Sequence, residues 1–176
     1  MNIILIGMRG SGKTTIGKML AEKLNMGFIE TDAIIEKKIG ESIIDIIEKS
    51  GWQKFRKIEH CIIKEVSFLN NCIISTGGGV VLNNKNVKLL KNNGIIIWLD
   101  TDVNILINRI GNNYHRPFLT NKKTAKEDIT EAYNNRIIFY KNASSVKIVN
   151  NDYPIATVNI IINLFLKLDP YVKFKN

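Results

Sequence analysis

Short runs of apolar residues recur along the chain, and longer amphipathic stretches separate them. An apolar run without polar alternation is typical of a strand that is buried on both faces of a parallel sheet. The sequence has such runs at residues 3–6, 72–74, 95–99 and 146–149, with a further short candidate strand at 27–30. Apolar residues in the intervening stretches repeat with helical spacing and predict helices at 13–24, 32–49, 53–69, 84–92, 102–110, 125–141 and 154–168. Strands that alternate with helices predict an α/β domain built on a parallel sheet.

The ends of the predicted strands indicate where function should lie. Ligands of an open parallel sheet bind at the carboxyl ends of its strands. The residues that follow the predicted strands are therefore candidates for the site, and they are 7–14, Asp32, 77–79 and Asp100.

Composition narrows the class of protein. The chain has 176 residues, of which 45% are hydrophobic and 23% charged, and these values suit one globular domain and argue against a disordered chain. No apolar run is long enough to cross a membrane, and residues 1–7 have neither the basic segment nor the cleavage site of a signal peptide. Cys61 and Cys72 form no metal-ligand spacing and no disulfide framework. We expect a single domain over residues 1–176, located in the reducing cytoplasm.

The formal net charge of +9 permits an acidic partner such as nucleic acid. The basic residues are mostly lysines scattered through the chain, and no basic stripe is interleaved with aromatic residues. The five arginines are Arg9, Arg56, Arg109, Arg116 and Arg136. We expect no nucleic-acid partner and no membrane partner.

The strongest motif lies between the first predicted strand and the first predicted helix. Residues 7–14 match G-x-x-x-x-G-K-[ST] at every fixed position, which a simple glycine-rich turn would not require. Its glycines let successive backbone N–H groups face phosphate oxygens. Lys13 then reaches the β- and γ-phosphates, and the Thr14 hydroxyl can bind Mg²⁺. The motif indicates a nucleotide with Mg²⁺ and leaves the phosphoryl acceptor open.

Two carboxylates follow the second predicted strand. Glu30 and Asp32 are two residues apart, so in extended chain they point the same way. One could support Mg²⁺ through water while the other accepts a proton from an attacking hydroxyl. The alternative is structural, because Asp32 could cap the helix that it precedes.

Arg56 and Glu59 lie one turn apart on the predicted helix 53–69. A guanidinium that a carboxylate holds in this way can clamp a ligand carboxylate. The spacing also suits an ordinary surface ion pair, which stabilises little.

Three consecutive glycines, Gly77, Gly78 and Gly79, end the third predicted strand. Either a ligand approaches the backbone there, or the chain leaves the strand sharply. The polar segment 111–123, which contains Arg116-Pro117, is either a lid over the site or a surface loop.

Arg136 is the most informative residue outside the phosphate loop. It lies in the middle of an apolar stripe on the predicted helix 125–141, which is formed by Ala125, Ile129, Ala132, Tyr133 and Tyr140. An inward arginine requires an anionic partner such as a ligand carboxylate or phosphate. The alternative is an arginine whose stem is buried and whose charged head reaches the rim.

These motifs occur in an order that resembles the shikimate kinase family. The resemblance covers residues 3–154 and rests on Asp32, Phe55-Arg56-x-x-Glu59, Thr76-Gly77-Gly78-Gly79, Arg116-Pro117-Phe118-Leu119 and Arg136-x-x-x-Tyr140-x-x-Ala143. It implies a three-layer α/β/α P-loop kinase fold of the nucleoside-monophosphate-kinase-like type. That fold has a five-stranded parallel sheet and a mobile lid, here at about 111–123.

The resemblance also implies a reaction and a role for each site residue. The reaction would convert ATP and shikimate into ADP and shikimate 3-phosphate, a step toward chorismate and the aromatic amino acids. Asp32 would bind the shikimate hydroxyls and act as base, Arg56 and Arg136 would hold its carboxylate, and Gly77, Gly78 and Gly79 would line its site. One Mg²⁺ would bind Thr14, Arg116 would contact the transferred phosphate, and Arg109 would lie over the adenine. ATP would be held by Gly10, Ser11, Gly12, Lys13, Thr14, Thr15, Arg109 and Arg116.

The sequence departs from the family pattern at three positions. Glu30 stands where the family usually has aspartate, Trp52 stands where it usually has glutamate, and Ile47 replaces an aromatic residue near the substrate pocket. The expected assembly is a monomer. The rival functions are a gluconate-type or other small-metabolite P-loop kinase and a nucleotide-dependent nucleic-acid-binding module.

Overall fold

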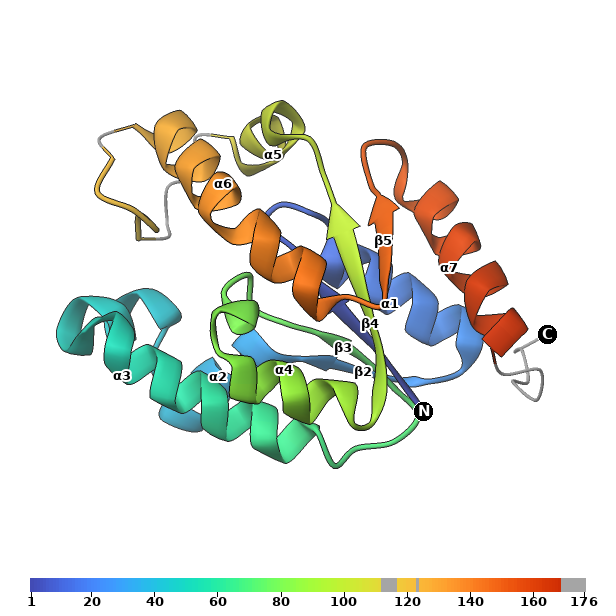
Figure 1. Cartoon of the computed structure of the whole chain (residues 1–176). Coiled ribbons are helices and arrows are strands. Elements are labelled where there is room, and N and C mark those ends of the chain that lie inside the picture. Colours follow the sequence, from blue (N-terminus) through green and yellow to red (C-terminus); the bar gives the residue numbers. More distant parts are fainter. Residues whose placement is uncertain (112–116, 123, 169–176) are drawn as a thin grey trace.

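The computed structural model describes residues 1–111, 117–122 and 124–168, and a five-stranded parallel sheet lies at its centre (Figure 1). The strands are β1 (Asn2–Ile6), β2 (Gly27–Glu30), β3 (Cys72–Ser75), β4 (Gly94–Asp100) and β5 (Val146–Val149), in the spatial order β2-β3-β1-β4-β5. All five predicted strands are confirmed. Their ends lie at most one residue from the predicted positions, because a buried apolar run has few alternative structures.

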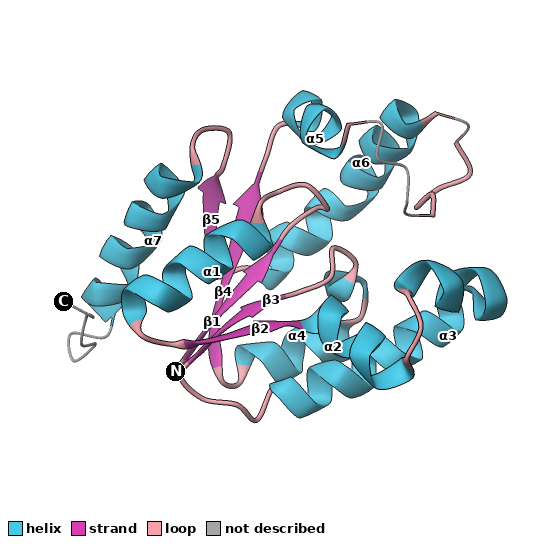
Figure 2. Ribbon diagram, turned by 180° about the vertical axis from the view of Figure 1, so that it is seen from behind, coloured by secondary structure: helices cyan, strands magenta, loops and turns pink. Residues whose placement is uncertain are grey.

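Helices cover both faces of the sheet, which confirms the predicted three-layer α/β/α architecture. The helices α1 (Lys13–Leu24) and α7 (Pro154–Leu168) pack together on one face (Figure 2). Alternate residues of β1 pack into two separate cores. Ile3 and Leu5 face α1, and Ile4 and Ile6 face the opposite layer of helices. This alternation explains why the strands read as continuous apolar runs.

The opposite layer contains the remaining helices. They are α2 (Thr31–Ile39), α3 (Ile43–Val66), the short 3₁₀ helix η1 (Val80–Leu82), α4 (Asn84–Lys91), α5 (Val103–Ile110) and α6 (Ala125–Ala143). Within the described ranges, no helix is long and apolar enough to cross a membrane.

The predicted division into helices 32–49 and 53–69 is wrong. The first helix ends at Gly40, whose φ of 77° is left-handed, and α3 begins after Ser42, whose side chain accepts a hydrogen bond from the Asp45 amide. The predicted gap at 50–52 is only a kink in α3 at Gly51, where φ is 75°. Glycine and serine supply the end and the start signal of the two helices.

Candidate active site

The phosphate loop connects β1 to α1, as the motif predicts. Gly10 and Gly12 adopt φ values of 79° and 85°, which an L-residue with a side chain rarely adopts. The buried Lys13 ammonium donates to the Gly7 and Met8 carbonyls at 2.9 and 2.8 Å. These contacts hold the lysine inside the curve of the loop, at the N-terminus of α1, where an anion is favoured.

Asn150 supports this loop from the end of β5. Its buried side-chain amide donates to the Ser11 carbonyl at 2.7 Å, and its side-chain oxygen accepts from the Thr157 hydroxyl at 2.7 Å. A β-carbon at Gly12 would lie 2.9 Å from the Asn150 side-chain nitrogen. Asn150 was not among the predicted site residues, although its place directly after a predicted strand was a signal for it.

The loop forms one wall of a cavity of about 670 Å³. The predicted nucleotide residues Gly10, Gly12, Lys13, Thr14, Thr15 and Arg109 all line it, whereas Ser11 is buried within the loop and does not. Arg109 donates to the Asn150 and Asp152 carbonyls at 3.1 and 3.3 Å. Arg116, the last predicted nucleotide ligand, lies outside the described residues.

Thr14 and Glu30 form an oxygen-rich corner of the larger cavity. The Thr14 hydroxyl donates to the Glu30 carboxylate, so the longer acidic side chain at position 30 reaches the predicted metal ligand. Among the described residues, no group of three His, Cys, Asp or Glu side chains could hold a metal ion. The Thr14 hydroxyl and the Glu30 carboxylate fit Mg²⁺, which proteins usually bind through one or two side-chain oxygens together with nucleotide phosphates.

Asp32 lies within the first turn of α2 and is not its cap. The N-cap position is Glu30, and α2 begins at Thr31. The structural alternative for Asp32 is therefore wrong. Its side chain instead lines both the larger cavity and a smaller one that adjoins it.

The smaller cavity, of about 60 Å³, brings together the residues predicted to bind the acceptor. Its lining includes Asp32, Arg56, Gly77, Gly78, Gly79 and Arg136. Arg9, Asp32 and Gly78 line both cavities. The two cavities therefore meet beside the phosphate loop.

Arg56 and Glu59 form an ion pair in which Arg56 is half-buried and Glu59 is buried, so the surface alternative is wrong. One Arg56 nitrogen donates to both Glu59 carboxylate oxygens at 2.8 Å, and Glu59 is only 1% exposed. Burial raises the pKa of Glu59, and this effect exceeds the lowering by Arg56. The Arg56 guanidinium also lies 5.1 Å from the ring centres of Trp52 and Phe55. Its orientation is therefore fixed by a carboxylate and two aromatic rings.

Trp52 and Ile47 both line the smaller cavity. The Trp52 ring packs edge-on against Phe55 at 5.8 Å between ring centres. Trp52 thus adds an aromatic ring to the wall that Ile47 also lines.

The head of Arg136 is buried, which contradicts the alternative that it reaches the rim. The residue is 7% exposed, and one guanidinium nitrogen donates to the Gly78 carbonyl at 3.5 Å. The Tyr140 hydroxyl donates to the same carbonyl. Burial lowers the pKa of Arg136, and the nearby positive charge of Arg56 lowers it further. In the part of the chain that the structure describes, no carboxylate forms an ion pair with Arg136.

A side chain on any of the three glycines would crowd neighbouring side chains or backbone. A β-carbon at Gly77 would lie 2.7 Å from an Asp32 carboxylate oxygen, and one at Gly78 would lie 3.2 Å from the Arg9 amide nitrogen. A β-carbon at Gly79 would clash with the Arg56 guanidinium. None of the three has a positive φ, so no left-handed backbone conformation requires glycine at these positions. Their lack of side chains lets Asp32, the phosphate loop and Arg56 approach one another.

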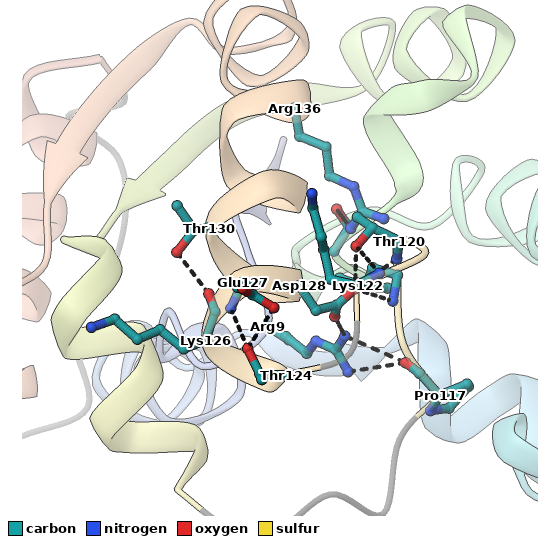
Figure 3. Close-up of polar contacts among 12 residues, drawn as sticks. Arg9, Pro117, Thr120, Lys122, Thr124, Lys126, Glu127, Asp128, Thr130 and Arg136 are labelled. Carbon is teal, nitrogen blue, oxygen red and sulfur yellow. Dashed lines mark hydrogen bonds and ion pairs between the residues drawn. The ribbon is translucent and has the colours of Figure 1, made fainter.

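The described part of the predicted lid lies beside both cavities. Phe118 lines the larger cavity, and Pro117 and Leu119 line the smaller one. The Pro117 carbonyl accepts from Arg9, and the Asp128 carboxylate accepts from the Thr120 hydroxyl (Figure 3). Residues 117–120 thus contact the phosphate loop and α6.

Comparison with known proteins matches this arrangement to one family. The family model described as "Shikimate kinase" matches residues 9–165. A shikimate kinase of Caldicellulosiruptor bescii is 47% identical over 80% of this chain and 81% of its own length, and that of Caldanaerobacter subterraneus is 38% identical over 95% and 97%. The structure of shikimate kinase from Acinetobacter baumannii in complex with shikimate superposes with a TM-score of 0.90 at 31% identity, covering 96% of this chain and 94% of that one.

Proposed function

The chain belongs to the shikimate kinase family, and from this membership we propose that it transfers the γ-phosphoryl group of ATP to a hydroxyl of shikimate. The products are shikimate 3-phosphate and ADP, in the pathway that leads to chorismate and the aromatic amino acids. The single observation that carries the proposal is the junction of the two cavities. A nucleotide on the phosphate loop and an acceptor held by Arg56 and Arg136 would meet there, next to Asp32.

The phosphate loop supplies the nucleotide side of the reaction. Backbone amides of residues 10–15 surround the phosphates, and Lys13 moves from the loop carbonyls to the β- and γ-phosphates. Thr14 would hold Mg²⁺ directly and Glu30 would hold it through water. When bound, Mg²⁺ neutralises charge on the phosphates. Arg109 flanks the base, and Arg116 contacts the transferred phosphoryl group.

The acceptor side discriminates by charge and shape. Arg56 and Arg136 bring two buried or half-buried positive charges to one small cavity, which favours an acceptor with a carboxylate. The pair with Glu59 fixes Arg56, whereas Arg136 remains for the ligand. Gly77, Gly78 and Gly79 let the acceptor ring lie against backbone.

The chemical step is an in-line displacement at the γ-phosphorus. The acceptor oxygen forms a bond to phosphorus while the bond from phosphorus to the bridging β,γ-oxygen breaks, and ADP leaves with that electron pair. Asp32 accepts the proton of the attacking hydroxyl. Because the transition state is loose, positioning and charge neutralisation contribute most of the rate enhancement.

A coupled ADP-release assay with three acceptors tests this proposal. We expect ATP turnover with shikimate and little with gluconate, which has a carboxylate but no ring, or with a nucleoside monophosphate, which has no carboxylate for the two arginines. Turnover that prefers gluconate would contradict the proposal. A gluconokinase from Sinorhizobium meliloti has a TM-score of 0.53 at 15% identity, which shows a shared fold only.

The proposal also covers the cellular location and the oligomeric state of the protein. We propose a monomer that acts in the cytoplasm on ATP and shikimate, without nucleic acid. Size-exclusion chromatography with light scattering, run at the protein concentration of the assay, tests the monomer.

A further inference from the structure

A buried carboxylate outside the proposed chemistry connects three segments. Asp128, in the first turn of α6, is only 1% exposed. One of its oxygens, Oδ1, accepts from the Leu119 amide at 2.8 Å, the Thr120 amide at 2.6 Å and the Thr120 hydroxyl at 2.8 Å. The other, Oδ2, accepts from the Arg9 guanidinium at 3.0 Å (Figure 3).

Capping of α6 does not explain Asp128. The cap of this helix is Thr124, whose side chain accepts from the Glu127 amide at 3.3 Å. A buried carboxylate is retained only where charged or polar partners compensate for its lost hydration. The Oδ1 atom of Asp128 accepts hydrogen bonds from residues 119–120, whereas Oδ2 accepts one from Arg9 in the phosphate loop.

Arg9 is the residue through which Asp128 reaches the reaction site. Its side chain is 14% exposed, and both terminal nitrogens also lie 3.4 Å from the Pro117 carbonyl. It lines both cavities, the larger one together with Lys13 and the smaller one together with Arg56 and Arg136. A guanidinium presents its donors in a rigid plane, so partners at one edge set the direction of the whole group.

We propose that Arg9 is a further cation of the phosphoryl-transfer site and that Asp128 is the positioning residue that orients it. The inference rests on the proposed kinase function. Negative charge spreads over the equatorial oxygens of the transferred group in the transition state. A guanidinium that is already oriented at the junction stabilises that charge without reorganisation during the reaction.

The substitution Asp128→Asn separates the two halves of this network. The asparagine oxygen keeps the position of Oδ1 and its three donors. The new amide nitrogen replaces Oδ2 and places a donor against the Arg9 donor. We expect kcat to fall roughly 10- to 150-fold, the range of one charge-assisted hydrogen bond. The KM values for ATP and shikimate should change less than about threefold, since the contact acts in the transition state.

Two further variants make the test specific. Arg9→Met removes the cation, and we expect a similar loss of kcat. The double variant Arg9→Met/Asp128→Asn should lose little more than either single variant, because both remove the same oriented charge. Thr124→Ala is the matched control: it removes the cap of the same helix and leaves the contact between Asp128 and Arg9 in place. It should lower the melting temperature while kcat stays near that of the unmodified protein.

The outcomes distinguish the inference from the proposed function. An unmodified protein without shikimate-dependent ADP release contradicts the proposed function itself. An active protein whose Arg9→Met variant keeps its kcat overturns the inference alone. Additive losses from Arg9→Met and Asp128→Asn also overturn it, because they assign Asp128 a structural role. If Asp128→Asn does not fold, the comparison of Arg9→Met with Arg9→Lys decides: loss of kcat in both variants supports an oriented guanidinium, and retention in Arg9→Lys overturns it.

Discussion

Arginine is scarce in this chain, and Arg56 and Arg136 both use their planar guanidinium groups in contacts at the smaller cavity. Arg56 pairs with both oxygens of a buried carboxylate and faces two rings, and Arg136 is buried on the Gly78 carbonyl. A lysine provides charge without a planar group of donors. Residue choice at these positions therefore reflects geometry more than charge.

Arg136→Lys tests that distinction. The substitution keeps the charge and loses the planar group of donors. We expect the KM for shikimate to rise roughly 10- to 150-fold, the value of a charge-assisted hydrogen bond to a carboxylate. The KM for ATP should move much less, which steady-state kinetics with each substrate varied in turn will measure. An acceptor that lacks the carboxylate should bind poorly and be nearly indifferent to the substitution. A rise in KM for ATP as large as that for shikimate would instead indicate a damaged fold.

Glu59 couples function to stability through its pKa. Because burial raises its pKa above the ordinary value of 4.5, the folded protein holds this proton more tightly than the unfolded chain. The corresponding stability is present at low pH and is lost as the pH rises from about 4.5 through the raised value. Burial raises the pKa of Glu59 more than the attraction of Arg56 lowers it.

Glu59→Gln should therefore separate stability from substrate binding. Relative to the unmodified protein, the free energy of unfolding of the variant should increase as the pH rises from 4 to 7, since glutamine has no proton to release. Urea titrations at a series of pH values measure this difference. The KM for shikimate should rise about 10-fold, because Arg56 loses its charged partner. A relative stability that falls with rising pH would show that the attraction of Arg56 dominates.

Among the secondary-structure elements, the link from β3 to η1 determines how closely the acceptor groups approach. Gly79→Ala adds a single methyl group where the Arg56 guanidinium lies, with no strain from a positive φ. We expect Arg56 to move away from the smaller cavity and the KM for shikimate to rise about 10-fold or more. The KM for ATP should hardly change. Equal kinetics for the variant would show that Arg56 does not need this position.

The end of β5 offers the complementary test on the nucleotide side. Asn150→Ala removes the donor to the Ser11 carbonyl and leaves the Thr157 hydroxyl without its acceptor. We expect the KM for ATP to rise about 10-fold, because the phosphate loop loses a buried hydrogen bond of about 1–1.5 kcal/mol. Isothermal titration with ADP gives an independent measure. A selective effect on shikimate would contradict the assignment of Asn150 to loop support.

Among the secondary-structure elements, the sequence predicts the features that a short contiguous segment encodes. Each strand is one apolar run, and the phosphate loop is contiguous, so both are visible in the chain. The break between α2 and α3 was missed because Ile35, Ile39 and Ile43 keep helical spacing across it. The burial of Glu59 and the contacts of Gly79 depend on packing between segments far apart in the sequence. The pattern identified these residues, and only the fold shows why they are needed.

At the scale of the whole molecule, strand order brings the parts of the site together. β1 pairs with both β3 and β4, so the phosphate loop after β1 lies beside the glycines after β3. β2 pairs with β3, which places Asp32 next to Gly77. β5 pairs with β4 and brings Asn150 to the phosphate loop from the other side. The connections of a single sheet thus couple nucleotide and acceptor regions.

This arrangement predicts how the whole molecule unfolds. Because both cavities are built on one sheet, we expect thermal unfolding in a single cooperative transition. ATP with Mg²⁺ at about 100 times its Kd should stabilise the folded state by about 2.7 kcal/mol. For a domain of this size, that shifts the melting temperature by about 5–10 °C, at about 2–4 °C per kcal/mol. Scanning calorimetry with potassium chloride at matched ionic strength as the control measures the shift. Shikimate should also raise the melting temperature, and the Arg136→Lys variant should lose most of that increase while it keeps the increase from ATP. Two separate transitions, only one of which responds to ATP, would contradict a single domain over residues 1–176.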